Sequence, residues 1–213
     1  MKCVIIGAGG HGKVVLEILR AAKKHEPVGF VDADPSLAGK KVGGLPVLGA
    51  ANVLGKLKAQ KIKGAIIAIG DNRARRSYAQ VLRQQGFELI NAVHPKAILS
   101  PTSKLGKGVV VAMGAVVGSE ATVGDLAIIN TSAVVDHECV IEEAAHVCPT
   151  AALAGKVRVG SCAFVGLGAK ILPCLTIGSE AVVGAGAVVL NDLLTGVTAV
   201  GVPAKVVKPA KAA

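Results

Sequence analysis

Aromatic residues are nearly absent from this sequence of 213 residues, which contains three Phe, one Tyr and no Trp. Most globular cores use aromatic rings to fill space, so this core must be built from Val, Ile, Leu and Ala in narrow layers. The same scarcity argues against nucleic acid as a partner, because proteins that bind RNA or single strands usually stack bases on aromatic side chains.

Long apolar runs are also missing. No stretch approaches the roughly eighteen uninterrupted apolar residues of a membrane helix, so we expect no membrane span. The apolar start of the chain is interrupted by Gly and His and lacks a small-residue cleavage site, which favours a buried strand over a signal peptide. The five cysteines are odd in number and include no CxxC pair. This pattern predicts reduced core thiols in a cytoplasmic protein.

Acidic residues are outnumbered, with 14 Asp and Glu against 24 Lys and Arg, which gives a formal net charge of +10. Such a balance favours anionic partners. Since nucleic acid is disfavoured, phosphorylated small molecules are the better candidates. For most of the basic residues the simpler explanation is an ordinary solvated surface.

A six-residue repeat dominates the second half of the chain. From Leu105 to Val189 every sixth residue is Leu, Ile or Val, at fifteen successive positions. A small or apolar side chain, most often Ala, stands four residues after each of them. This period is typical of a parallel β-helix, in which short strands stack coil upon coil. Three hexads per coil predict five coils that advance by about 4.8 Å each, with polar side chains facing outward at the third, fourth and sixth hexad positions.

The first ninety-odd residues alternate between strand and helix patterns, which predicts a small parallel α/β sheet of Rossmann type. The expected strands cover 2–7, 28–31 and 65–69, and the expected helices run to about residue 24, over about 50–60 and from 70 to about 85. The boundary falls near the His94-Pro95 pair. We therefore predict an α/β nucleotide-sugar-binding domain at 1–94, a β-helix domain at 95–201 and a C-terminal tail at 202–213.

The turn after the first expected strand reads Gly7-Ala8-Gly9-Gly10-His11-Gly12 and matches GxGxxG, with Asp32 twenty residues after the last glycine. Glycines there let the backbone approach a diphosphate, and the following helix N-terminus supplies N–H groups. The usual interpretation is NAD with Asp32 on a ribose. However, ninety residues are few for two mononucleotide halves, so a single nucleotide or nucleotide sugar fits better. The alternative is that the glycines only let helix pack on strand.

His137 is the most informative polar residue of the repeat. It occupies the third hexad position, so it should project from the β-helix between Asp136 and Glu138. A histidine takes a proton near neutral pH, and an adjacent carboxylate can orient it. Strand alternation does not choose between the two acids, and a plain surface histidine is the alternative. His146 follows half a coil later, so the two histidines meet only across a neighbouring chain or around a corner. Zinc is not expected, because His137, Glu138, His146 and Cys148 fall on different faces.

Taken together, these segments resemble the hexapeptide-repeat acetyltransferases that carry an N-terminal Rossmann-like domain. This NeuD/PglD-like family contains sialic-acid O-acetyltransferases and UDP-4-amino-sugar N-acetyltransferases of bacterial glycan biosynthesis, and the similarity runs nearly end to end. The motifs that carry it are Gly7–Gly12, Phe30–Asp32, Ala68–Asn72, Asn130–Cys139 and Gly201–Lys205.

The resemblance implies a left-handed β-helix, acetyl-CoA as cosubstrate and a homotrimer in which the pantetheine arm lies between two prisms. It further implies direct acetyl transfer to the 4-amino group of a UDP-4-amino-4,6-dideoxy sugar, with sialic-acid O-acetylation as the alternative. His137 would be the general base and Glu138 the residue that tunes it. The implied acetyl-CoA contacts are His146, Gly155, Leu167, Ala185 and Lys205, and the implied nucleotide-sugar contacts are Gly9, Gly10, His11, Asp32, Gly70, Asp71, Asn72 and Asn130.

Close amino-sugar members of that family have two consecutive acids after the second strand, whereas this chain reads Asp32-Ala33-Asp34. Asp32 is therefore the better candidate for the nucleotide contact. Two hypotheses from other classes stay open at this point. One is a nicotinamide-dependent oxidoreductase fused to a structural prism, and the other is a non-catalytic scaffold that trimerises through the β-helix.

Overall fold

The structure is a computed structural model that describes residues 1–209, and it divides into two compact units, residues 1–95 and residues from 96 onward. Residues 210–213, the end of the predicted C-terminal tail, lie outside the described residues. Within residues 1–209, no helix is long and apolar enough to cross a membrane.

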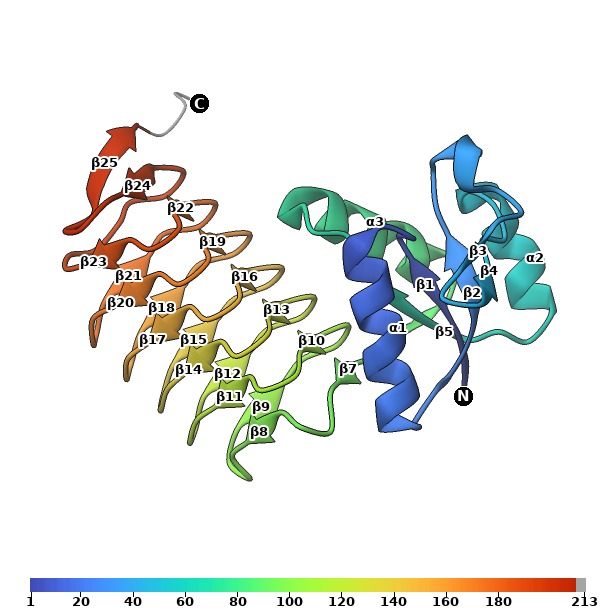
Figure 1. Cartoon of the computed structure of the whole chain (residues 1–213), viewed down its shortest axis with the longest axis horizontal. Coiled ribbons are helices and arrows are strands. Elements are labelled where there is room, and N and C mark those ends of the chain that lie inside the picture. Colours follow the sequence, from blue (N-terminus) through green and yellow to red (C-terminus); the bar gives the residue numbers. More distant parts are fainter. Residues whose placement is uncertain (210–213) are drawn as a thin grey trace. The chain divides into compact units, whose positions relative to one another are not determined.

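The first unit is built on a parallel sheet with strand order β2-β1-β5-β6, accompanied by three α-helices (Figure 1). The predicted α/β alternation is confirmed. Strands β1 and β5 are apolar and buried throughout their C-terminal parts, as expected for parallel strands covered on both faces. The elements are β1 (Lys2–Ile6), α1 (Gly10–Ala22), β2 (Glu26–Val31), η1 (Pro35–Leu37), β3 (Lys41–Val42), β4 (Leu45–Pro46), η2 (Ala51–Val53), α2 (Leu54–Ala59), β5 (Gly64–Ile67), α3 (Asn72–Gln84), β6 (Glu88–Leu89) and β7 (Ala92–Val93).

The second unit is a three-sided prism of stacked short strands, which confirms the predicted parallel β-helix. Each side is a parallel sheet whose neighbouring strands lie eighteen residues apart, as Val116 does from both Ile98 and Val134. We name the sides by their first strand as the β8 face, the β9 face and the β10 face. Only β25 runs antiparallel to its neighbour in this unit of the described chain.

The β8 face consists of β8 (Ile98–Leu99), β11 (Val116–Val117), β14 (Val134–Val135), β17 (Ala152–Leu153), β20 (Lys170–Ile171) and β23 (Val188–Val189). The β9 face consists of β9 (Lys104–Leu105), β12 (Thr122–Val123), β15 (Val140–Ile141), β18 (Arg158–Val159) and β21 (Thr176–Ile177). The β10 face contains β10 (Val110–Val111), β13 (Ile128–Ile129), β16 (His146–Val147), β19 (Phe164–Val165), β22 (Val182–Val183), β24 (Thr198–Val200) and β25 (Lys205–Lys208).

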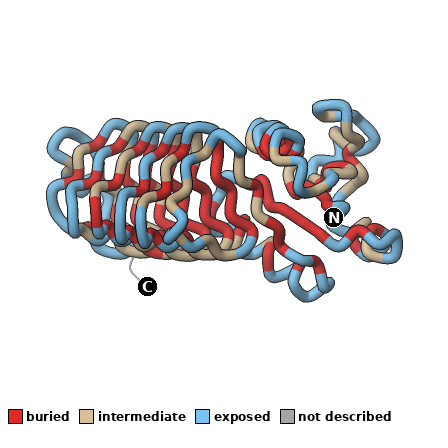
Figure 2. Tube along the Cα trace, turned by 90° about the horizontal axis from the view of Figure 1, so that it is seen from below, coloured by how far each residue is buried: buried red, intermediate tan, exposed pale blue. Residues whose placement is uncertain are grey.

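Burial in the prism follows the hexad. The Leu, Ile or Val at the first position and the small or apolar residue at the fifth point inward and form a narrow core, seen as red bands along the coils in Figure 2. The stack begins at Ile98–Leu99, one strand before the hexads from which five coils were predicted, so the β8 face has six strands. The segment predicted as a tail from residue 202 includes β25, which pairs with β24.

The corners between faces impose a backbone requirement at the fourth hexad position. Ten non-glycine residues there adopt a left-handed conformation, and Glu138 is one of them, with φ of 57°. Left-handed backbone is uncommon outside glycine, so the stacked hydrogen bonds of the coils must hold it in place. Side chains at this position range from fully buried, as for Leu126 and Ala144, to exposed, as for Glu138.

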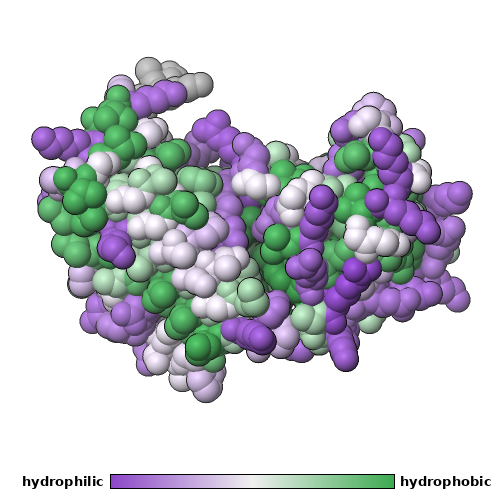
Figure 3. Space-filling view, in the orientation of Figure 1, coloured by the Kyte–Doolittle hydropathy of each residue, from purple (hydrophilic) through white to green (hydrophobic). Residues whose placement is uncertain are grey.

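Large apolar side chains also appear on the outside of the prism. Figure 3 shows hydrophobic surface gathered at its C-terminal end, over β24 and β25, where Val206 is 53% exposed and Val207 62%. On the β8 face, Ile98 is 65% exposed and Val134 36%. Exposed apolar groups in such number are typical of surfaces that contact a partner.

Candidate active site

His137 stands at the corner that follows β14, where the chain turns from the β8 face to the β9 face. Its backbone N–H donates to the Asp136 carboxylate over 2.7 Å, and its ring Nδ1 lies 3.0 Å from Oε2 of Glu138. An ionised carboxylate only accepts hydrogen bonds, so Nδ1 carries the proton and Nε2 keeps the lone pair. Of the two acids that the sequence left open, Glu138 contacts the ring and Asp136 contacts the backbone.

Gly155 lies one coil beyond His137, against the imidazole. A Cβ atom at Gly155 would come within 2.3 Å of Nε2 and 2.4 Å of Cε1. A side chain at this position would therefore require the ring to move. With its side chain 52% exposed, His137 presents a basic nitrogen beside bare main chain, and its other nitrogen is fixed by Glu138. This arrangement suits proton removal from an incoming nucleophile.

Lys156 completes the charges at this corner. Its Nζ lies 3.6 Å from Oε1 of Glu138, the oxygen that does not face His137, and its backbone N–H donates to the His137 carbonyl over 2.9 Å. An exposed ion pair of this kind contributes little to stability. Its effect is to bias the orientation of the Glu138 carboxylate.

A second group of predicted residues gathers near another corner of the prism, where the chain turns from the β10 face to the β8 face. The side-chain amide of Asn130 lies 3.1 Å from Nε2 of His146, and the Phe164 ring meets His146 edge-on at 5.3 Å. His146 lies on the outer side of its strand, as the sixth hexad position requires, yet it is only 8% exposed. Neighbouring coils cover it, which the hexad rule for polar residues did not anticipate.

Leu167 and Ala185 lie at this second corner too. They follow β19 and β22, which are one and two coils beyond the strand that carries His146. Leu167 is 55% exposed, and its carbonyl accepts a hydrogen bond from the Gly186 N–H over 2.7 Å. Ala185 is exposed as well. Lys205, the remaining predicted acetyl-CoA contact, lies on the exposed strand β25.

Within one chain the two corners do not meet. His137 and Gly155 stand where strands of the β8 face end, and Asn130 and Leu167 stand where those of the β10 face end. One strand of the β8 face separates these two corners in the chain, as β14 separates Asn130 from His137. The two histidines accordingly have different neighbours: His137 contacts Glu138, whereas His146 contacts Asn130 and Phe164.

In the first unit, the glycine turn divides into two pairs. Gly7 has φ of +101°, and a Cβ there would lie 2.8 Å from the Ala68 carbonyl oxygen, while a Cβ at Gly12 would lie 2.1 Å from the Gly7 oxygen. These two glycines serve the packing of helix on strand. Gly9 and Gly10 have no such neighbour, since a Cβ at either would meet nothing within 4 Å. They leave open space at the N-terminus of α1, where backbone N–H groups accumulate.

Asp32 and His11 flank this turn. The Asp32 carboxylate accepts hydrogen bonds from the N–H groups of Ala8 (2.7 Å) and Asp34 (2.9 Å), so it braces the turn from within. Burial, reinforced by the positive charge of Arg75, lowers the pKa of His11 to about 4. Its buried Nε2 has no hydrogen-bond partner among the described residues.

The loop after β5 holds the other predicted nucleotide-sugar residues. Open space surrounds Gly70, where a Cβ would meet nothing within 4 Å. Asp71 caps α3, because its Oδ1 accepts from the Ala74 N–H over 2.7 Å. Asn72 is 8% exposed, and its Oδ1 accepts from Arg75 Nη2 over 2.8 Å.

Two residues at this edge escaped the sequence analysis. Arg75 is fully buried, and Tyr78 lies near Asp32, since burial and then the charge of Asp32 raise the pKa of its hydroxyl. A signal for Arg75 was present in the sequence. It falls on the stripe of α3 whose buried members are spaced as the inward side of a helix: Asn72, Arg75, Ala79 and Leu82.

The cysteines divide into four buried thiols and one exposed thiol, Cys174. Burial raises the pKa of Cys3 and of Cys148 to about 12, which suppresses thiolate formation. Cys174 departs from the expected core location. It occupies a left-handed corner position, with φ of 64°, as does the buried Cys162, with φ of 57°. Within residues 1–209, no three His, Cys, Asp or Glu side chains are grouped as metal ligands.

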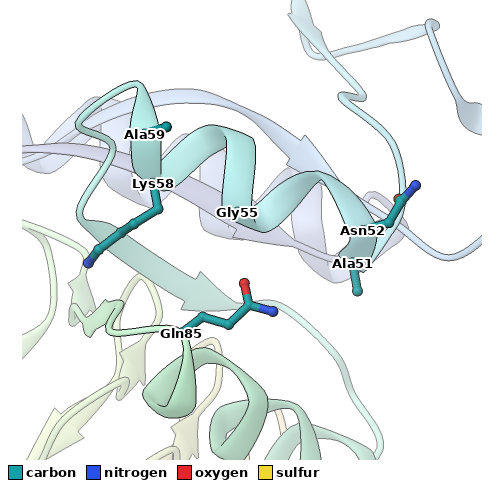
Figure 4. Close-up of a pocket in the computed structure, with 6 residues that line it drawn as sticks. All are labelled: Ala51, Asn52, Gly55, Lys58, Ala59 and Gln85. Atoms are coloured by element: carbon teal, nitrogen blue, oxygen red, sulfur yellow. The ribbon is translucent and has the colours of Figure 1, made fainter.

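A pocket of about 590 Å³ lies in the first unit between the η2–α2 segment and the end of α3 (Figure 4). Its lining residues are Ala51, Asn52, Gly55, Lys58, Ala59 and Gln85. None of the residues predicted from the sequence lines it. Lys58 is engaged there, since it donates to the Gly86 carbonyl and lies over the Phe87 ring.

Comparison with known proteins identifies relatives of the whole chain. Residues 2–82 match the PglD N-terminal domain family. A variant of perosamine N-acetyltransferase from Caulobacter crescentus, solved with CoA and GDP-perosamine, is 48% identical, with 97% of this chain and 96% of that one covered and a TM-score of 0.93. The acetyltransferase domain of PglB from Neisseria gonorrhoeae, solved with acetyl coenzyme A, is 38% identical, with coverages of 97% and 98% and a TM-score of 0.90.

A curated relative matches over a shorter stretch. The UDP-N-acetylbacillosamine N-acetyltransferase of Bacillus subtilis is 34% identical over 108 residues, which are 50% of this chain, and the match spans about half (49%) of that protein's length. The similarity to the solved structures covers nearly the full length of both chains. This chain therefore belongs to the PglD-like family of sugar acetyltransferases, as its motifs indicated.

Proposed function

We propose that this protein transfers an acetyl group from acetyl-CoA directly to the 4-amino group of a nucleotide-linked 4-amino-4,6-dideoxy sugar. The observation that carries the proposal is the His137–Glu138 pair, whose ring contact of 3.0 Å and open Nε2 supply a general base at an exposed corner. Relatives solved with CoA, acetyl coenzyme A and GDP-perosamine support the substrate class.

The reaction follows from the tautomer of His137. A neutral amine attacks the thioester carbonyl, and Nε2 removes the proton that the new ammonium must lose. Collapse of the tetrahedral intermediate then breaks the C–S bond, and the CoA thiolate leaves as the free thiol once it has taken the proton from Nε2–H. Glu138 stabilises the imidazolium through Nδ1–H. The backbone N–H at Gly155 is the donor we assign to the oxyanion of the tetrahedral intermediate. No covalent enzyme intermediate is needed.

For the nucleotide we favour guanosine diphosphate over the uridine diphosphate that the family resemblance suggested. The reason is the 48% identity to the relative solved with GDP-perosamine, against 34% over half the chain for the relative named for a UDP sugar. We assign the nucleotide to the first unit, to the open turn at Gly9 and Gly10 and the loop at Gly70.

We further propose a homotrimer in which each active site lies between two prisms. The separation of the two corners supports this arrangement, because His137 and Gly155 of one chain need a second chain to face the His146 and Leu167 group. The exposed apolar side chains of the β8 face, such as Ile98 and Val134, are suited to such an interface. Light scattering tests it, and a monomer at micromolar concentration would contradict it.

The assay offers the purified protein acetyl-CoA together with the GDP-linked amino sugar, the UDP-linked amino sugar or sialic acid, and identifies products by mass spectrometry. We expect acetylation of the GDP-linked amine and loss of at least about 100-fold in kcat with His137→Asn. The matched control is His25→Asn, in the first unit. Turnover of sialic acid alone, or an unchanged kcat in His137→Asn, would refute the proposal.

A further inference from the structure

Arg75 is the largest fully buried side chain of the described residues, with 0% exposure. Burying an ionised guanidinium costs folding free energy, and an apolar side chain of similar volume fills a core without that cost. The position therefore calls for a role that apolar packing does not supply.

The hydrogen bonds of Arg75 point to that role. Its Nη1 donates to the carbonyl of Ile69 over 2.8 Å and to that of Gly70 over 3.3 Å, and its Nη2 donates to Oδ1 of Asn72 over 2.8 Å. The two carbonyls belong to the loop that connects β5 to α3, and Asn72 is the first residue of α3. The planar fork of arginine suits such a set of acceptors, whereas the single ammonium of lysine does not.

These contacts determine which way the loop presents its donors. In a trans peptide the N–H points opposite to the C=O of the same unit. Because the carbonyls of Ile69 and Gly70 turn toward Arg75, the N–H groups of Gly70 and Asp71 turn away from it. Open space lies beside Gly70 itself, where a Cβ would meet nothing within 4 Å.

The same guanidinium also influences the neighbouring glycine turn. Its charge, second to burial, lowers the pKa of His11, so His11 is neutral at pH 7. Tyr78, one turn further along α3, lies near Asp32. The N-terminal half of α3 is thus linked to both segments around the turn at Gly9 and Gly10. Arg75 acts on His11, and Tyr78 lies near Asp32.

We propose that Arg75 is a positioning residue of the nucleotide-sugar site, and that its buried guanidinium holds the Ile69–Asn72 loop in the shape that receives the diphosphate. The inference rests on the proposed function. It assigns to Arg75 no contact with the substrate.

The test compares Arg75→Met, which removes all donors, with Arg75→Lys, which keeps the charge and one point of contact. The control is Arg83→Met, an exposed arginine at the other end of the same helix. We expect KM for the nucleotide sugar to rise about 10- to 100-fold in Arg75→Met and less in Arg75→Lys. KM for acetyl-CoA should stay within about twofold, and Arg83→Met should match the wild type.

Two further measurements separate the possible outcomes. GDP alone, titrated by calorimetry, should bind the wild type and Arg83→Met but bind Arg75→Met at least about tenfold more weakly. In Arg75→Met, NMR should show His11 titrating at a higher pH than in the wild type, because a nearby positive charge is gone.

Folded Arg75 variants with wild-type KM and GDP affinity would overturn this inference and leave the proposed function intact. Failure of both variants to fold would also overturn it, because Arg75 would then serve the fold alone. A wild-type protein that binds no nucleotide and acetylates no amino sugar would instead overturn the proposed function.

Discussion

Replacing Gly155 by Ala gives the sharpest test of the His137 corner. The added Cβ would lie 2.3 Å from Nε2 of His137, so the ring must retreat by about 1 Å to reach ordinary van der Waals contact. That retreat pulls Nδ1 away from Glu138, which it meets at 3.0 Å in the native chain. Gly155 does not have a left-handed backbone, so alanine strains nothing there except the ring.

A displacement of about 1 Å at a reacting group costs on the order of 100-fold in rate, which corresponds to about 2.7 kcal/mol in the activation free energy. We therefore expect Gly155→Ala to lower kcat for sugar acetylation about 100-fold while its thermal unfolding matches that of the wild type. Steady-state kinetics with both substrates and a melting curve make the measurement. Gly55→Ala is the matched control, since a Cβ at Gly55 meets nothing within 4 Å.

The result that would refute this reasoning is a folded Gly155→Ala protein with wild-type kcat. A rise in KM for acetyl-CoA at constant kcat would refute it too, because the glycine would then serve cosubstrate binding and not the placement of the ring.

Three further predictions concern stability and reactivity. With a pKa of about 4 in the folded protein against 6.5 for a free histidine, His11 takes its proton first in the unfolded chain. The contribution of neutral His11 to the free energy of unfolding is therefore present above pH 6.5 and falls by about 2 kcal/mol on going to pH 5. Urea unfolding above pH 6.5 and at pH 5 should show this loss, and His11→Gln should make the free energy of unfolding depend less on pH. A disulfide reagent at pH 8 should modify Cys174 rapidly and leave Cys3 and Cys148 unmodified, because burial raises the pKa of both to about 12; fast reaction of more than one thiol in the native protein would contradict this. Removing the cap in Asp71→Ala should lower the unfolding free energy of the first unit by about 1 kcal/mol, measured by urea denaturation, and an unchanged midpoint would rule out its capping role.

The prism was readable from the sequence because a coil of three hexads places chemically equivalent residues above one another. Leu153 can be assigned to the core from its hexad position alone, and its burial, at 1% exposed, follows from the repeat. His146 shows where the rule fails. Its outward orientation follows from strand alternation, but its cover by Phe164 depends on which residue the next coil supplies.

The helix expected over 50–60 shows a similar limit at a boundary. The structure begins this segment as the 3-10 turn η2 and continues it as α2 from Leu54. Neither start has a side-chain cap, so the sequence carried no capping signal from which to place the first turn. In α3, by contrast, Asp71 supplies such a signal and forms the cap.

By itself, the sequence determined the α/β unit, the repeat and the projection of His137 beside two acids, because strand and hexad periods depend only on residue order. Tertiary structure alone decided that Glu138 holds the ring while Asp136 holds the backbone, since both acids are adjacent to His137 in the chain. It also decided that a Cβ at Gly155 would collide with His137, because that ring comes from the preceding coil, eighteen residues earlier. Contacts between coils depend on how two side chains fill the same space, and the order of residues does not fix that.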